Sequence, residues 1–235
     1  MSSQRVISLV PSLTETLLAL GITPIACTRF CEQPSLVHVG GTKDPDVPAI
    51  IELRPDVVLM DREENRREDA EALTEAGVNV VSTHVTSVGD VAEVLADLVR
   101  QFDIEQLPPD RSGNPPVATP LRRAFIPIWR RPWMTLSEGT YGSSLLAWIG
   151  IVNVFAGHPM TYPTVQLDDV ALAKPDLVLL PSEPYPFKTR HADEISSVVP
   201  GAEIRFIDGQ DLFWWGVRTR GAAQRLAQTL DCSSP

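Results

Sequence analysis

An internal repeat is the feature that most constrains the fold of this chain. Residues 53–60 read Leu-Arg-Pro-Asp-Val-Val-Leu-Met, and residues 173–180 read Ala-Lys-Pro-Asp-Leu-Val-Leu-Leu. A second pair, residues 17–22 and 145–151, matches in the same order with one inserted residue. Two ordered matches favour two related lobes that arose by duplication. In each copy the proline ends a helix and the aspartate begins the turn into an apolar strand, so the repeat is informative about the fold.

Short apolar runs alternate with helical patterns on both sides of a proline-rich segment, which predicts an α/β fold with mostly parallel sheets. Five prolines between residues 106 and 120 indicate a linker. We therefore predict two Rossmann-like α/β lobes with a ligand cleft between them, joined by a connecting helix that is shortened or broken. The predicted parts are an N-terminal lobe with the start of that helix, a linker and a C-terminal lobe, over residues 1–105, 106–121 and 122–235.

The pattern also predicts individual elements. Strands are expected at residues 6–10, 24–27, 57–60, 78–81, 124–129, 177–180 and 204–207. Helices are expected at residues 12–20, 47–53, 64–76, 91–102, 140–149, 167–173 and 216–230. The segment Ser12-Leu-Thr-Glu15 has the form of a capping box, so we expect Ser12 to cap the first of these helices and Glu15 to complete the cap.

The charge and hydropathy of the chain limit the kinds of molecule that it can bind. The chain has 20 Lys and Arg against 30 Asp and Glu, a formal net charge of −10, which disfavours a nucleic-acid partner. No apolar run is long enough to span a membrane, and the first residues lack the pattern of a signal peptide. We expect a monomer that binds a small molecule. We expect it in the cytoplasm as encoded, or in the periplasm or another extracytoplasmic space if the chain is a trimmed form.

Cysteines and histidines form no pattern typical of a metal or catalytic site. Cys27 and Cys31 lie four residues apart without a second Cys or His pair at metal-ligand spacing, so we interpret them as buried or loop thiols. The four histidines are widely separated, and motifs for a nucleophile or for phosphate binding are absent. We therefore predict no catalytic residue, no metal site, no intrinsic cofactor and no enzymatic activity.

Aromatic side chains gather in polar or proline-rich loops, where a planar apolar face suits a flat, partly hydrophobic ligand. These rings could instead seal the two lobes together. Arg218 falls at the start of the predicted last helix, where a cation opposes the helix dipole and favours an anionic partner or a ligand acceptor. An ordinary solvated arginine is the alternative. The candidate ligand-binding residues are Phe30, Trp133, Tyr162, Asp211, Trp214, Trp215 and Arg218.

Several segments together resemble a known family. The chain resembles the iron-siderophore and vitamin B12 class of substrate-binding proteins of ABC transporters, the helical-backbone metal receptors. The order of the motifs carries the resemblance more than any single one does. The segments are Arg5–Gly21, Val39–Asp46, Leu53–Leu59, Asp61–Asp69, Trp133-Met-Thr, Asn153-Val-Phe, Lys174-Pro-Asp and Ser182-Glu-Pro-Tyr-Pro-Phe187.

The resemblance implies a non-enzymatic binding protein for cobalamin or another metal chelate, such as haem or a siderophore complex, that delivers its ligand to an ABC permease. It places Phe30, Trp133 and Tyr162 at stacking positions and the segment from Asp211 to Arg218 near the corrin side chains. It also places Glu68 and Asp168 near the acidic positions that dock on the permease; both could be ordinary surface charges. We expect Trp133→Ala to weaken ligand binding by about 1–3 kcal/mol and to leave the fold intact.

Two alternatives remain open at this point. One is a cytoplasmic tetrapyrrole- or metal-handling protein, or an enzyme, on the same two-lobed scaffold, because a fold does not fix a function. A cluster of His84, His158 and a carboxylate would favour it. The other is a protein-interaction module that has lost ligand binding.

Overall fold

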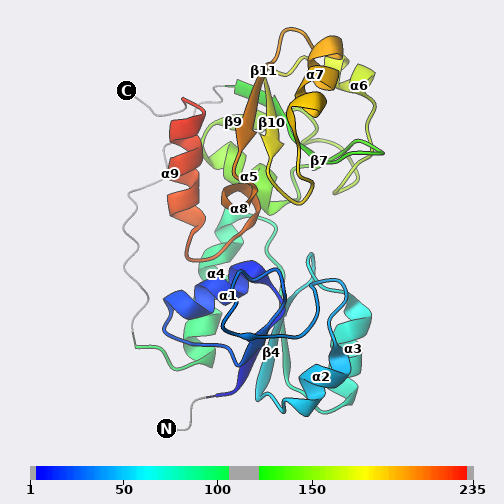
Figure 1. Cartoon of the computed structure of the whole chain (residues 1–235). Helices are drawn as coiled ribbons and strands as arrows, with labels where there is room; N and C mark the ends of the chain where they lie inside the picture. The colour runs from blue at the N-terminus through cyan, green and yellow to red at the C-terminus, as the bar shows by residue number, and fades with distance from the viewer. Residues whose placement is uncertain (1–3, 106–121, 232–235) are drawn as a thin grey trace. The chain divides into compact units, whose positions relative to one another are not determined.

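The computed structural model describes residues 4–105 and 122–231, which form two compact units (Figure 1). The first unit contains residues 4–85, 89–105 and 215–217, and the second contains residues 86–88, 122–214 and 218–231. The predicted linker, 106–121, lies outside the described residues. The predicted domain boundaries stay a prediction, and each unit is described by itself below.

The first unit is built on a parallel sheet of five strands among its described residues, in the order β3-β2-β1-β4-β5. The strands are β1 (Val6–Ser8), β2 (Ala26–Cys27), β3 (Val37–His38), β4 (Val57–Asp61) and β5 (Val80–Thr83). The chain runs outward from β1 through β2 to β3 and then returns to the other side of β1 at β4. The strand order therefore reverses between β1 and β4, and this is the place where open α/β sheets usually bind ligands.

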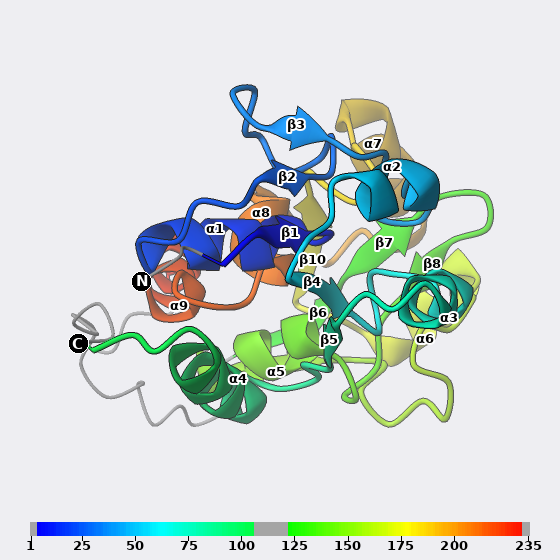
Figure 2. The ribbon, with the colours of Figure 1, turned by 90° about the horizontal axis from the view of Figure 1, so that it is seen from below.

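Helices cover both faces of this sheet (Figure 2). They are α1 (Pro11–Ala19), α2 (Val47–Glu52), α3 (Arg67–Glu75) and α4 (Val88–Gln101). Helices α2 and α3 lie on one side of β4, and α1 and α4 lie on the other. The core between the sheet and the first pair contains Ile7 and Val58 from the strands with Ile50 and Leu73 from the helices, all fully buried.

The second unit has a parallel sheet of four strands in its described part, in the order β11-β10-β6-β9, and an antiparallel pair, β7-β8. The strands are β6 (Arg122–Phe125), β7 (Pro127–Trp129), β8 (Met134–Thr135), β9 (Ile151–Asn153), β10 (Leu177–Pro181) and β11 (Glu203–Ile207). Here the strand order reverses between β6 and β10. All five residues of β10 are buried, as its continuous apolar run predicts for a central parallel strand.

Helices also flank the second sheet. They are α5 (Tyr141–Trp148), α6 (Leu167–Ala173), α7 (Thr189–Val198), α8 (Gly209–Phe213) and α9 (Thr219–Thr229). One core cluster joins Phe125 of β6 and Val178 of β10 to Val170 of α6 and Ile195 of α7. The prediction of a mixed α/β fold with parallel sheets in two lobes is confirmed. No helix within residues 4–105 or 122–231 is long and apolar enough to cross a membrane.

The repeat has the same structural purpose in both units. Helix α2 leads through Arg54-Pro-Asp56 into β4, and α6 leads through Lys174-Pro-Asp176 into β10. Arg54 and Lys174 both end their helices in the left-handed region, with φ of 46° and 49°. Asp56 then accepts a hydrogen bond from the backbone N of Arg5 at 2.7 Å, and Asp176 accepts one from the backbone N of Arg123 at 2.8 Å. Each copy therefore fastens a central strand to its neighbour.

Three local predictions were wrong or incomplete. The helix α1 begins at Pro11, so its N-cap is Val10, without a side-chain cap, and Ser12 lies inside the helix instead of capping it. The strand expected at 124–129 is two elements, β6 and β7, because Pro127 interrupts the ladder. The last helix begins at Thr219, after Gly216 with its φ of 119°. The sequence pattern also missed β3, β8, β9, α7 and α8.

The predicted connecting helix corresponds to α4, which is 14 residues long and spans Val88–Gln101 instead of 91–102. The segment that would show whether it continues, 106–121, lies outside the described residues.

Candidate functional site

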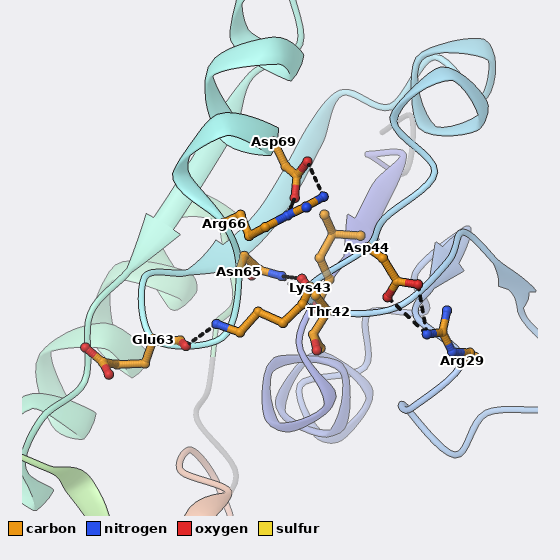
Figure 3. A network of polar contacts seen from close by, with 9 residues as sticks. Arg29, Thr42, Lys43, Asp44, Glu63, Asn65, Arg66 and Asp69 are labelled. Atoms are coloured by element: carbon orange, nitrogen blue, oxygen red, sulfur yellow. Dashed lines mark hydrogen bonds and ion pairs between the residues drawn. The ribbon is translucent and has the colours of Figure 1, made fainter. Parts of the chain in front are cut away.

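In the first unit, Asn65 holds together the loops at the point where the strand order reverses. Its side-chain amide donates to the backbone O of Leu9, after β1, at 3.2 Å and to that of Thr42, after β3, at 2.9 Å. Its Oδ1 accepts from the backbone N of Asp61, at the end of β4, at 2.8 Å. The side chain is buried, and Figure 3 shows it reaching toward Thr42. One amide group therefore fixes three loops at the carboxyl edge of the sheet.

Charged side chains extend this network (Figure 3). Lys43 Nζ donates to the backbone O of Glu63 at 2.6 Å, which joins the loop after β3 to the loop after β4. The Glu63 carboxylate lies 3.5 Å from His84 Nε2, in the loop after β5. The buried carboxylate of Asp61, at the end of β4, accepts a hydrogen bond from Thr83 Oγ1 at 2.7 Å. Burial raises the pKa of the Asp61 carboxyl, and the Thr83 hydrogen bond opposes that rise.

Phe30 lies in the loop after β2 and is half-exposed, with 50% of its surface accessible. The guanidinium of the neighbouring Arg29 lies 4.7 Å from the centre of its ring, and Arg29 also forms an ion pair with Asp44 at 3.0 Å. A Cβ atom at Gly41 would lie 2.7 Å from Arg29 Nη2, so glycine at this position leaves room for the ion pair. The ring of Phe30 is thus held at the surface with area left for a ligand.

Cys27 and Cys31 are buried, as predicted, and both are free thiols. Cys31 Sγ lies 3.2 Å from the hydroxyl of Thr14 and 3.2 Å from that of Thr28. Hydrogen bonding from Cys27 lowers the pKa of the Cys31 thiol to about 6, helped by the two hydroxyls and opposed by burial. The pKa of Cys27 is raised, first by the hydrogen bond with Cys31 and then by burial. The pair therefore holds one thiolate inside the protein near neutral pH.

We expect this thiolate to make stability depend on pH. The folded pKa of Cys31 lies below its ordinary value of 9.0, so the unfolded chain binds more protons between pH 6 and pH 9. Stability should therefore fall as pH decreases through this window, by at most about 1.4 kcal/mol per pH unit. Urea unfolding of the reduced protein and of Cys31→Ser at several pH values measures this. A difference between the two proteins that does not change with pH would contradict the assignment.

In the second unit, Trp133 is a core residue. It is 5% exposed, stacks on Phe187 with ring centres 6.0 Å apart and an angle of 6°, and lies under the guanidinium of Arg130 at 4.6 Å. The ring fills the cluster around Phe125 and Val178, so we expect its removal to cost stability, which the prediction from the sequence did not include. Its proposed contact with a ligand stays a prediction.

Three of the candidate ligand-binding residues lie close together in the second unit: Asp211, Trp214 and Arg218. Arg218 is the N-cap residue of α9, and its guanidinium lies 5.1 Å from the centre of the Trp214 ring and 3.9 Å from Asp211. Asp211 is buried and forms two hydrogen bonds with Arg225, at 2.8 and 2.5 Å. Trp214 Nε1 donates to Glu183 at 2.7 Å. The anionic partner that the position of Arg218 favours is therefore within the chain itself.

The remaining candidates differ in exposure. Tyr162 is in the loop before α6 and is 37% exposed, whereas Trp215 is buried and is grouped with the first unit. Glu68 and Asp168 are exposed residues in the first turns of α3 and α6, where acidic side chains also stabilise the helix dipole. Their contact with a permease stays a prediction.

The described residues contain no group of three or more His, Cys, Asp or Glu side chains placed to hold a metal ion. His84 lies beside Glu63, whereas the ring of His158 accepts a hydrogen bond from the backbone N of Met160 in its own loop.

Sequence reasoning missed Asn65 and the arginines that follow β7. Asn65 lies within the segment Asp61–Asp69 that carries the family resemblance, but nothing in its neighbours indicates that it bonds to Leu9, which is 56 residues away. The run Arg130-Arg131 beside Trp133 was a visible signal of a cationic loop.

These features define an α/β protein of two units, and comparison with known proteins shows what the chain is similar to. Residues 6–102 match the family model described as periplasmic binding protein. The vitamin B12-binding protein of Pectobacterium carotovorum is 27% identical, with 99% of this chain and 90% of that protein covered. The resemblance predicted from the sequence is confirmed: the chain is similar to periplasmic binding proteins, among them vitamin B12-binding proteins.

Solved structures show the same fold. The periplasmic vitamin B12-binding protein BtuF of Vibrio cholerae superposes with a TM-score of 0.73 at 21% identity, over 97% of this chain and 96% of that one. The periplasmic haem-binding protein HutB of Vibrio cholerae superposes with a TM-score of 0.77 at 18% identity, over 97% and 99%. The vitamin B12-binding protein of Pectobacterium carotovorum is named as a binding protein, in line with the prediction that this chain is not an enzyme.

Proposed function

We propose that this protein is the substrate-binding component of an ABC importer and that its ligand is a corrinoid of the cobalamin type. The observation that carries the proposal is the similarity to a vitamin B12-binding protein along 99% of the chain. The ligand is cargo rather than an intrinsic cofactor. In this proposal Glu68 and Asp168 contact the permease, and a location outside the cytoplasm remains a prediction.

The exposed aromatic rings support a flat ligand. Phe30 and Tyr162 keep accessible ring surface, and aromatic faces bind planar macrocycles through contacts that depend on area. Trp214 and Arg218 add a half-buried ring and a guanidinium, and Trp214 is oriented by its hydrogen bond to Glu183. Arg218 can meet an amide or acidic group at the edge of the macrocycle.

Titration with cyanocobalamin, haemin and a ferric siderophore tests the proposal, followed by tryptophan fluorescence and visible absorbance. We expect saturable quenching by cyanocobalamin at micromolar or lower concentration. Saturable binding of haemin alone would replace the corrinoid with a haem, which the structural similarity to HutB makes the second candidate. No response to any of the three would overturn the chelate-binding function.

We expect Phe30→Ala to weaken binding of the preferred chelate by about tenfold, because one large aromatic contact is lost. The matched control is Phe206→Ala, since Phe206 is also 50% exposed and lies on β11 in the second unit. Calorimetric titration of the two variants gives the comparison. Equal affinities for Phe30→Ala and the unchanged protein would remove Phe30 from the site.

A further inference from the structure

A cavity of about 390 Å³ lies within the second unit, beside the place where its strand order reverses. Two segments form it. Arg130 and Arg131 follow β7, and the other segment follows β10 and enters α7. The lining residues are Arg130, Arg131, Tyr185, Arg190, His191 and Glu194. None of them is a candidate for chelate binding.

The charges of this pocket do not balance. Three arginines face one carboxylate, and Arg130 binds that carboxylate, Glu194, through two hydrogen bonds, one of them 3.1 Å long. Arg130 also covers the ring of Trp133, so its position is held from two sides. The side chain of Arg131 forms no hydrogen bond or ion pair with any described residue. Two guanidinium groups, those of Arg131 and Arg190, therefore have no carboxylate partner in the pocket.

His191 adds a third N–H group to this pocket. Its ring is buried, and Nδ1 accepts a hydrogen bond from the backbone N of Lys188 at 2.9 Å. Burial and the charge of Arg190 lower the pKa of His191, so the ring is neutral at pH 7 and carries its proton on Nε2. Nε2 lies 3.2 Å from Nε of Arg190, which is also a donor, and the Tyr185 hydroxyl is at 3.5 Å. With the proton on Nε2, the acceptor nearest to it in the pocket is the Tyr185 hydroxyl at the long distance of 3.5 Å, and the Nε–H of Arg190 lies beside it.

We propose that this pocket binds a small oxyanion with two or more negative charges, a phosphate group or a polycarboxylate. Its oxygens would accept from the guanidinium groups of Arg131 and Arg190 and from Nε2 of His191, and the ring of Tyr185 would border its less polar part. Planar guanidinium groups pair with such oxygens in bidentate geometry. The inference goes beyond chelate transport, because none of the residues that line the pocket is a candidate for chelate binding.

Calorimetric titration of the full chain with inorganic phosphate and with citrate tests this site. We expect saturable binding of at least one probe, with phosphate preferred if the natural group is phosphoryl and citrate preferred if it is a carboxylate. Arg131→Gln and Arg190→Gln should each weaken binding by about tenfold, the loss of one charge-assisted hydrogen bond. Both residues are exposed, so circular dichroism should show folded variants.

Arg123→Gln is the matched control, because it removes the same charge from an exposed residue of the second unit outside the pocket. Unchanged binding in this control supports the site. Absence of binding by both probes, or equal weakening in all three variants, would overturn it. Neither result depends on whether the protein binds a chelate.

Discussion

Trp133→Ala is expected to lower the free energy of unfolding by about 3–5 kcal/mol, the range for truncating a fully buried large aromatic side chain. The ring is 5% exposed, stacks on Phe187 and supports the guanidinium of Arg130, so the variant leaves a cavity in the core of the second unit. Urea unfolding followed by circular dichroism measures the loss.

Trp129→Ala is the control for that loss. Trp129 lies four residues earlier in the same unit, but it is 44% exposed and touches Tyr185 only edge-on, with ring centres 5.4 Å apart. We expect a loss of about 1 kcal/mol or less for this variant. Equal losses for the two tryptophans would show that the burial of Trp133 is not the cause. A lower ligand affinity of Trp133→Ala indicates a lost ligand contact only if the stability measurement shows that the variant is folded under the conditions of the titration.

Asn65→Ala should destabilise the first unit by about 3 kcal/mol, because each buried backbone group left without its partner costs about 1–3 kcal/mol. The variant removes the acceptor for the N of Asp61 and the donor for the O of Leu9 and of Thr42. Urea unfolding measures the effect. Asn79→Ala makes the same chemical change on an exposed residue, and we expect it to stay within about 0.5 kcal/mol of the unchanged protein.

Asn65→Asp separates hydrogen bonding from packing. The aspartate keeps the size of the side chain and an acceptor for the N of Asp61, but it lacks the two N–H donors and brings a carboxylate toward two carbonyl oxygens and the buried Asp61. We expect it to be at least as destabilising as the alanine. An Asn65→Asp protein as stable as the unchanged one would rule out the amide as the group that joins the three loops.

Two candidate site residues with a similar sequence context differ in burial in the structure. Phe30 and Trp133 both stand in short loops after strands with an arginine nearby, and both were interpreted as ligand-stacking rings. In the structure Phe30 is half-exposed, whereas Trp133 is closed in by Phe187, which is 54 residues further along the chain. A loop position in the sequence carries no information on which distant segment packs over it.

Local patterns determined most of the fold. The runs at 57–60 and 177–180 are apolar over four residues and follow Pro-Asp, so each is a buried parallel strand after a helix, wherever it lies in the chain. The helix predicted at 167–173 has the same first and last residues in the structure, because Lys174-Pro-Asp176 marks its end. Two of the errors fell where a single proline decided the boundary: Pro11 moved the start of α1, and Pro127 divided a strand.

The sequence by itself therefore determined the α/β class, the repeated helix-turn-strand unit and the relation to substrate-binding proteins, because each depends on the order and spacing of residues near one another. Only the tertiary structure decided that Asn65 joins three loops, that Asp211 is the partner of Arg225 and Arg218, and that Arg131 and Arg190 share a pocket. Those properties depend on burial and on contacts between distant segments, which form when the strand ends are brought to one edge of a sheet.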